Sequence, residues 1–299
     1  MNEHIILLPK RLNKNYISEL IGKTNFIYSL EGANKPDYHF VIREILDMDL
    51  LGVLIVYKIL EYSYKQGCFR KPTFNCIPKE VNKKFQQNIK KYGFGELISE
   101  CFDNSEEAYK NLKTETIDGF LVAPMALSNN AQEAEHLVNA TIREVKRYFR
   151  QENKQNALDA CIMISEVLSE LFGNFYAHAN DKTNSIIVVR GNSHIIQITC
   201  ADSGFGITET LRDVEKYKTK DEGYILEHAL RKGVTSKPGT NHMGHGLWLI
   251  NEIVNKNQGT LFIYTQSICY YTKYKKPIVV PRWKGTIVDI ILNIDNPIY

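Results

Sequence analysis

Hydrophobic residues recur along the chain in two alternating patterns, one typical of strands and one typical of helices. In residues 1–101, the short apolar runs HIILLP, YHFVIREI and FRKPTFNCI predict strands. The largely apolar segment LLGVLIVYKILEYSYKQG (Leu50–Gly67) predicts a long helix, and KEVNKKFQQNIKKYGFGELI predicts an amphipathic one. Strands that alternate with helices indicate an α/β layer, so residues 1–101 are expected to form a small α/β domain.

Residues 102–129 interrupt this pattern. CFDNSEEAYKNLKTETIDG is polar and breaks the periodicity, whereas GFLVAPM (Gly119–Met125) predicts a strand, so we expect a linker that contains one strand. A helix is predicted for NNAQEAEHLVNATIREVKRYFRQ, and the remaining chain again mixes helical and strand patterns. Residues 130–299 are therefore expected to form a second α/β domain.

Three polar residues share one face of the helix predicted for SEVLSELFGNFYAHAN. Glu170, Asn174 and His178 are four residues apart, which stacks their side chains on consecutive turns. A carboxylate, an amide oxygen and an imidazole suit a general base, a Mg²⁺ ligand and a polar pocket wall. The alternative is an ordinary solvated face of an amphipathic helix.

Asp202 comes directly after a predicted β-hairpin. The runs Ile186–Arg190 and Ile195–Cys200 are β-branched, and a Gly-Asn-Ser turn signal lies between them. Gly204 and Gly206 follow, and glycines let the backbone bend tightly and approach a ligand closely. An Asp at this point accepts a hydrogen bond from an exocyclic amine; the alternative is a common Asp-Ser-Gly turn.

Glycines also open the helix predicted for GHGLWLINEIVNKNQG. The free N–H groups after Gly244 and Gly246 are suited to phosphate, because the helix dipole favours an anion there. The polar segment between Ile207 and Met243 predicts a mobile lid, in which Lys237 is a candidate cation for the terminal phosphate or simply a solvated lysine. Each motif is weak alone, but their order and spacing together indicate a nucleotide pocket.

Composition adds few constraints. The length of 299 residues suggests about two domains, and 37 basic against 34 acidic residues is too balanced to argue for nucleic acid. No apolar run approaches the roughly 18–20 residues needed to span a membrane, and the N-terminus lacks a signal-peptide pattern. The six cysteines show no metal-binding spacing. We therefore expect a protein of the reducing cytoplasm.

The three motifs resemble the N, G1 and G2 boxes of the GHKL (Bergerat-fold) ATPase/kinase superfamily, which includes gyrase B, histidine kinases, anti-sigma-factor kinases and mismatch-repair ATPases. SELFGNFYAH is most similar to the form in anti-sigma-factor serine kinases. TSKPGTNHMGHG resembles their lid, and KGTIVDIILN resembles the late strand that closes the pocket. Over residues 130–295 the resemblance implies a two-layer α/β sandwich, with a mixed sheet and helices on one face.

The resemblance also implies individual roles. Glu170 would be the catalytic residue that orients or deprotonates the nucleophile, Asn174 would hold Mg²⁺, and Asp202 would bind the adenine amine. Phe175 departs from the usual alanine, so its ring is expected either to face the core or to displace the helix. The other positions expected to contact ATP are His178, Gly204, Gly206, Ile207, Lys237, Gly244, His245, Gly246, Leu247 and Thr286.

The order of elements in residues 1–101 resembles a STAS domain, the fold of anti-sigma-factor antagonists. LDMDLLGVL is similar to the STAS loop before its first long helix, and EVNKKFQQNIKKYGFGELI to its closing segment. The loop often carries a phosphorylatable serine, but Leu46–Leu54 contains no Ser or Thr, so phosphorylation is not expected there. Asp47 and Asp49 are expected to cap the following helix.

Together these features predict a Mg²⁺-ATP-binding regulatory protein that hydrolyses ATP or phosphorylates a protein partner. The alternative is a non-catalytic module in which ATP gates binding to another protein. Anti-sigma kinases commonly dimerise, so the resemblance also suggests a homodimer. A DNA-associated ATPase is disfavoured because no transducer domain follows and the net charge is only +3. The Tyr-, Lys- and Pro-rich insertion CYYTKYKKPIVVPRWKG is expected to be a hairpin or a partner surface.

Overall fold

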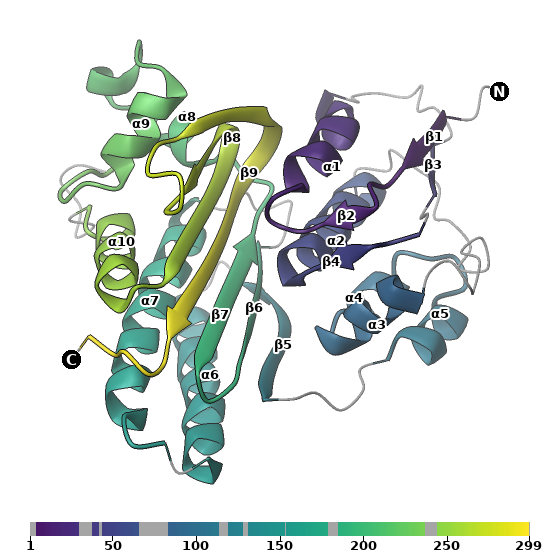
Figure 1. Cartoon of the computed structure of the whole chain (residues 1–299). Coiled ribbons are helices and arrows are strands. Elements are labelled where there is room, and N and C mark those ends of the chain that lie inside the picture. Colours follow the sequence, from purple (N-terminus) through teal and green to yellow (C-terminus); the bar gives the residue numbers. More distant parts are fainter. Residues whose placement is uncertain are drawn as a thin grey trace. The chain divides into compact units, whose positions relative to one another are not determined.

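The chain contains both helices and strands, which confirms the predicted α/β class (Figure 1). Contacts divide it into two compact units, Met1–Ile117 and Asp118–Tyr299. The computed structural model describes residues 4–29, 38–41, 44–65, 83–113, 119–127, 131–152, 154–178, 185–236 and 244–298.

The first unit has two short pairs of parallel strands. Strand β1 (His4–Leu7) pairs with β3 (Tyr38–Val41), and β2 (Arg11–Leu12) pairs with β4 (Asp47–Met48). The strand predicted for FRKPTFNCI lies outside the described residues. The helices are α1 (Ile17–Thr24), the 3₁₀ helix η1 (Asn25–Ser29), α2 (Leu50–Lys65), α3 (Lys83–Lys91), α4 (Gly95–Ser99) and α5 (Ser105–Leu112).

Helix α2 begins where the sequence predicted a capped helix. The Asp49 carboxylate accepts a hydrogen bond of 2.8 Å from the backbone N–H of Gly52, so Asp49 satisfies a free donor of the first turn. Asp47 instead accepts a hydrogen bond from the Asn13 side chain. A Cβ atom on Gly52 would lie 1.8 Å from the Leu12 carbonyl oxygen, so this glycine lets α2 approach strand β2 closely.

The segment 102–129 is divided between the two units rather than forming one linker. Helix α5 lies in the first unit, where it packs against α3 and α4. Strand β5 (Phe120–Leu127) belongs to the second unit, where it pairs with β6 (Ser185–Gly191). Residues 102–112 were expected to be a linker because they are polar. Helix α5 was not predicted there, since a short helix with a narrow buried face has little hydrophobic periodicity.

The second unit contains a five-stranded sheet in the order β5-β6-β7-β9-β8. Its other strands are β7 (Ile195–Ala201), β8 (Thr260–Tyr271) and β9 (Ile278–Asn293). The expected mixed sheet is wrong, because all four pairs of neighbouring strands are antiparallel. The predicted hairpin is confirmed as β6–β7, and β8 and β9 form a second one; strands joined by such hairpins have to run antiparallel.

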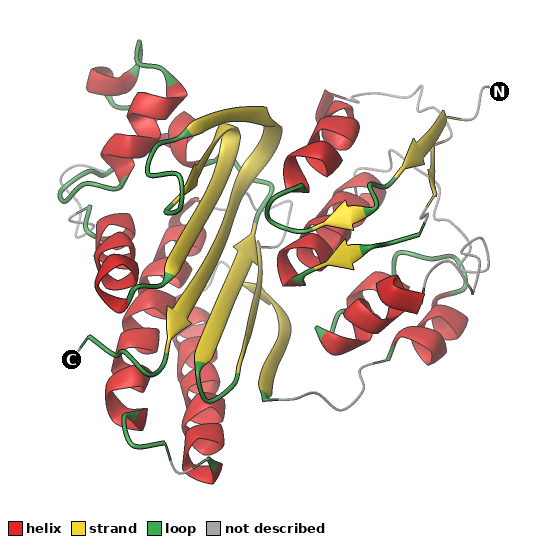
Figure 2. Ribbon diagram, viewed as in Figure 1, coloured by secondary structure: helices red, strands yellow, loops and turns green. Residues whose placement is uncertain are grey.

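Helices α6 (Ala131–Gln151), α7 (Ala157–His178) and α10 (Gly246–Asn257) lie together over one face of this sheet (Figure 2). Phe175 is 5% exposed and belongs to the core, so its ring faces the core, the first of the two outcomes expected for this position. The core between helices and sheet includes Val145, Phe149, Ile164, Leu168, Leu171, Ile187, Val189, Ile198, Ile250, Val254, Val288 and Ile290.

The chain between β7 and α10 forms a small helical subregion. It consists of α8 (Ile207–Arg212), the 3₁₀ helix η3 (Glu215–Tyr217) and α9 (Glu222–Ala229). These pack around their own small core of Leu211, Tyr217, Ile225 and Ala229. Asp221 caps α9 by accepting a 2.9 Å hydrogen bond from the backbone N–H of Tyr224. No helix within the described ranges is long and apolar enough to cross a membrane.

Candidate functional site

Two side chains of α7 meet the first residue of α10. A Cβ atom on Gly246 would lie 2.6 Å from Glu170 Oε2 and 3.2 Å from Asn174 Nδ2. Only glycine therefore fits without displacing these polar groups, and the start of α10 lies directly beside them. Asn174 Nδ2 is buried and has no hydrogen-bond partner among the residues that the structure describes. A buried polar atom of this kind is expected to have a partner, and a bound ligand can supply one.

Asp202 lies where strand β7 ends, and it is held on its backbone and its side chain. Its N–H donates to the Thr286 carbonyl at 2.9 Å, which extends the β7–β9 ladder by one residue. Its carbonyl accepts a 3.1 Å hydrogen bond from Trp283 Nε1. Its carboxylate Oδ1 accepts the N–H of Gly204 at 2.6 Å. With 6% of its surface exposed, Asp202 is a buried carboxylate in a fixed position.

The environment of Asp202 favours the neutral, protonated form of the nearby Cys200 thiol. Cys200 is fully buried on β7, and burial raises the pKa of its thiol well above the ordinary value. The carboxylates of Asp289 and Asp202 raise this pKa further. Cys200 is therefore a neutral core residue rather than a nucleophile.

Gly285 and Gly206 allow the loop after β7 to lie against the β8–β9 hairpin. Gly285 has φ +107° within a register shift of the hairpin, and a Cβ there would lie 2.5 Å from the Asp202 carbonyl oxygen. Gly206 has φ +84°, and a Cβ there would lie 2.7 Å from Thr265 Oγ1. Because L side chains rarely adopt such angles, both positions require glycine.

Side chains of β8 also hold this loop. Thr265 Oγ1 accepts the N–H of Ile207 at 2.9 Å, which fixes the first residue of α8. The side-chain amide of Gln266 donates to the Phe205 carbonyl and accepts a 2.9 Å hydrogen bond from Arg282 Nε. The buried hydroxyls of Ser203 and Thr208 have no hydrogen-bond partner within the described ranges. The loop is thus anchored, while the hydroxyls of Ser203 in the loop and Thr208 in α8 remain available to water or a ligand.

The residues before α10 form a second tight backbone approach. Gly244 has φ +67°, and its carbonyl accepts a 3.0 Å hydrogen bond from the N–H of Gly233. A Cβ on Gly244 would lie 2.6 Å from the Val234 carbonyl oxygen. His245 precedes the helix, and its ring centroid lies 5.8 Å from that of Trp248. Leu247 is half-buried and packs against both apolar cores of the second unit.

Several of the expected site residues meet in two groups. One group joins Glu170 and Asn174 to Gly246, and the other joins Asp202 and its glycines to Thr286. The side chain of His178 and the whole of Lys237 lie outside the described residues, so their predicted roles stay predictions.

Sequence reasoning missed three residues that position the Asp202 loop. All three come from the β8–β9 hairpin; Arg282 and Trp283 lie in the segment expected to be an insertion, and Gln266 precedes that segment. Trp283 is fully buried and Gln266 almost fully buried, which is unusual for these residue types on strands. The β8–β9 register places them opposite each other, where both donate hydrogen bonds to backbone carbonyls of the Asp202 loop. No spacing rule in the sequence joins them to Asp202.

The residues present fit a Mg²⁺ ion with few protein ligands. The described part of the chain contains no cluster of three or more His, Cys, Asp or Glu side chains of the metal-binding type. Mg²⁺ does not require one, since it is commonly held by one or two protein oxygens together with phosphate and water. The Asn174 amide can rotate to present its oxygen where its unpartnered nitrogen now lies.

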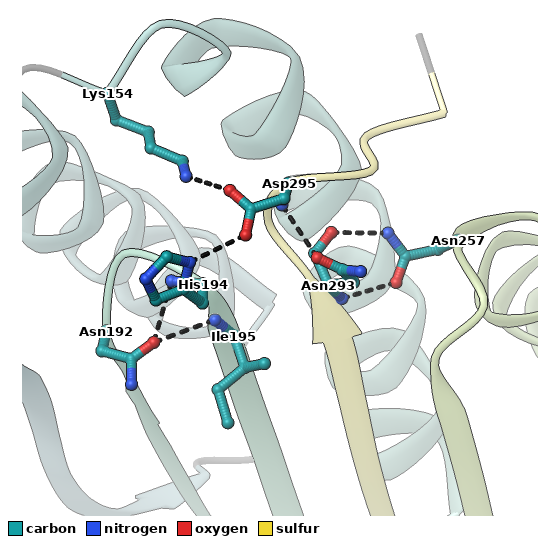
Figure 3. Close-up of polar contacts among 7 residues, drawn as sticks. All are labelled: Lys154, Asn192, His194, Ile195, Asn257, Asn293 and Asp295. Carbon is teal, nitrogen blue, oxygen red and sulfur yellow. Dashed lines mark hydrogen bonds and ion pairs between the residues drawn. The ribbon is translucent and has the colours of Figure 1, made fainter.

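The opposite end of the sheet contains a different polar group (Figure 3). Asp295 forms an ion pair with Lys154 and accepts a 2.8 Å hydrogen bond from His194 Nδ1. These two contacts lower the pKa of Asp295. A pocket of about 350 Å³ adjoins it, lined by His194, Ile195, Gln258, Gly259, Thr260, Ile291, Asn293 and Asp295. Because His194 and Asp295 are exposed, this cluster suits a surface ion pair better than a desolvated catalytic dyad.

Comparison with known proteins does not assign this chain to a family. A scan against protein-family models finds none that matches the chain, and a search of curated proteins finds no match either.

Proposed function

We propose that this chain is a Mg²⁺-ATP-binding regulatory protein of the GHKL type, which hydrolyses ATP or transfers its terminal phosphoryl group to a protein partner. The observation that carries the proposal is the position of Gly246 beside Glu170 and Asn174. In the resembling superfamily the N and G2 boxes form one pocket, and here residues of both boxes are in contact. The order of α7, β7, α10 and the β8–β9 hairpin also agrees with a Bergerat fold, whereas the antiparallel sheet differs from the mixed sheet of that superfamily.

Each residue then has a defined task. The carboxylate of Asp202 accepts a hydrogen bond from the adenine amine, and the N–H groups at the start of α10 donate hydrogen bonds to the phosphates. Asn174 holds Mg²⁺, which neutralises charge on the phosphates. Glu170 orients the nucleophile and takes its proton, whether that nucleophile is water or a protein hydroxyl. The core position of Phe175 leaves the polar face of α7 free for these roles.

The first unit is proposed to be STAS-like and to take part in regulation. Its parallel strand pairs, and the start of α2 directly after the loop at Asp49, support this reading. The loop lacks a hydroxyl residue, so the proposed regulation does not depend on phosphorylation at that loop.

Calorimetric titration of ATP, with and without Mg²⁺, tests the proposal together with phosphate release. We expect Asp202→Asn to weaken ATP binding about tenfold or more, since the mutant amide places a donor near the adenine amine. Asn174→Ala should remove the Mg²⁺ dependence of binding, and Glu170→Ala should abolish turnover while leaving binding intact. Asp159→Ala, in the first turn of α7, is the matched control and should behave as wild type.

Labelled ATP separates the possible activities. Label transferred to a protein partner identifies a kinase, and phosphate released without transfer identifies an ATPase. Tight binding by the wild type with neither outcome identifies the ATP-gated binding module instead. If wild-type protein does not bind ATP at all, the proposed function is wrong.

A further inference from the structure

The β8–β9 hairpin extends well beyond the part that forms the sheet. Strand β7 pairs with β9 only over residues 287–293, whereas β8 and β9 remain paired as far as Cys269 and Ile278. Figure 1 shows this extension arching over one end of the sheet. The N–H of Thr272 donates to the Leu261 carbonyl at 3.0 Å, so the beginning of the turn lies beside the first residues of β8. We call residues 266–284 the basic ribbon.

The basic ribbon carries several positive charges and contains no acidic residue of its own. No Asp or Glu occurs from Ile253 to Val288, while the ribbon itself contains Lys273, Lys275, Lys276, Arg282 and Lys284. The first three lysines are exposed in the turn, and none forms an ion pair with another residue of the described ranges. Lys275 has φ +59° and its N–H donates to the Tyr271 carbonyl, so an ordered turn presents this charge. A fixed patch of one sign attracts and orients a partner of the opposite sign.

The ribbon also exposes aliphatic side chains. Val279 is 86% exposed and Ile278 is 43% exposed, although both are β-branched residues of a strand. They pair with β8 on one side, and no strand among the described residues pairs with them on the other. Pro277 and Pro281 flank this open edge, which limits added pairing to a short stretch and discourages extended aggregation. A short extended segment of another protein fits such an edge.

The aromatic rings of the ribbon favour a protein partner over single-stranded nucleic acid. Tyr271 and Tyr274 pack edge to face at 5.4 Å, and Tyr271 packs against Phe262 at 6.0 Å with rings 72° apart. Base stacking on single-stranded nucleic acid needs free ring faces, whereas these rings already contact one another. An open strand edge with exposed aliphatic residues can form backbone hydrogen bonds and apolar contacts with an extended peptide. Nucleic-acid bases cannot pair with a strand in this way.

We propose that the basic ribbon docks an extended, acidic segment of a partner protein along Ile278–Val280. The exposed lysines of the turn receive its carboxylates, and Ile278 and Val279 contact its apolar side chains. This docking does not depend on ATP, so it can be tested whether or not the proposed function is right.

Fluorescence anisotropy with two labelled synthetic peptides, one alternating valine with glutamate and one alternating valine with lysine, tests the proposal on the full chain. The glutamate peptide should bind, the lysine peptide should not, and salt should weaken binding. The triple variant Lys273→Gln/Lys275→Gln/Lys276→Gln should bind about tenfold more weakly, because each exposed charge contributes modestly. Val279→Lys should also weaken binding, which distinguishes apolar contact from charge alone.

The matched control is Lys83→Gln/Lys110→Gln/Lys113→Gln, which removes the same charge from exposed positions of the first unit and should bind as wild type. Unchanged thermal unfolding of each variant shows that folding is intact. Equal binding of both peptides, or unchanged binding by the ribbon variant, overturns the proposal. It is also overturned if single-stranded DNA or anionic vesicles bind more tightly through these lysines. Self-association of the chain that Val279→Lys abolishes would assign the edge to a second copy instead.

Discussion

The two ends of the central strands β7 and β9 are built in opposite ways. Near Asp202 the structure relies on backbone approach, with Gly285 and Gly206 at positive φ and buried hydrogen bonds around them. At the other end, His194, Lys154 and Asp295 interact through exposed side chains. Backbone approach leaves no room for substitution, whereas exposed ion pairs tolerate it. This difference supports the proposal that the Asp202 end binds the ligand.

One residue near Asp295, Asn257, is as buried as the residues around Asp202. Asn257 has no exposed surface, and its amide donates to the carbonyls of Asn293 and Asn296 at 2.8 and 2.7 Å. Its oxygen accepts the N–H of Asn293 at 2.7 Å. This residue joins the end of α10 to the end of β9, so its role is structural.

The largest expected effect is that of Gly285→Ala. Its Cβ would meet the Asp202 carbonyl and carboxylate oxygens at 2.5 and 2.6 Å, and alanine rarely adopts φ +107°. We expect a loss of stability on the order of 3 kcal/mol together with loss of ATP binding. Urea unfolding followed by tryptophan fluorescence measures it, because both tryptophans, Trp248 and Trp283, lie in the second unit.

Gly173→Ala on α7 is the control for this substitution. Apart from the neighbouring backbone of α7 itself, no atom of the described residues lies within 4 Å of a Cβ at this position, so alanine should stabilise the helix by about 0.5–1 kcal/mol. Equal effects of the two substitutions would contradict the claim that backbone approach shapes the Asp202 end.

Asn257→Ala is expected to reduce stability by about 2 kcal/mol, because three partly buried backbone groups lose their partner. ATP affinity should stay unchanged, since Asn257 contacts the end of β9 that lies away from Asp202. The exposed residue Asn255 on the same helix provides the control, and Asn255→Ala should change stability by less than about 0.5 kcal/mol. A loss of ATP affinity in Asn257→Ala would mean that the two ends are coupled.

The smallest expected effect is that of Asp295→Asn. Because Lys154 and His194 lower its pKa in the folded state, Asp295 adds stability above the ordinary aspartate pKa of about 3.9. This contribution is lost as the pH falls through the lowered pKa. Wild type and variant should thus differ slightly in unfolding free energy at neutral pH and converge in strong acid. A double-mutant cycle with Lys154→Gln isolates the ion pair, and a difference that grows in acid would contradict this account.

Local pattern predicted many elements because their burial is periodic. The helices α2, α6, α7 and α10, the β6–β7 hairpin and the cap at Asp49 all follow from residues close in sequence. Helix α5 was missed because its pattern is short, and the sheet was expected to be mixed because strand direction was inferred from a resemblance. Register shifts such as the one beside Gly285 leave no periodic signal.

By itself, the sequence determined the residue types of the candidate site and their local spacing, from Glu170 and Asn174 on one helix face to the glycines near Asp202. The tertiary structure decided which of them meet. It placed Gly246 against Glu170 and Asn174, and it brought Trp283 to the carbonyl of Asp202, 81 residues away. Periodicity reports only which face of an element is buried, whereas contacts between distant residues depend on how the elements pack and on their strand register.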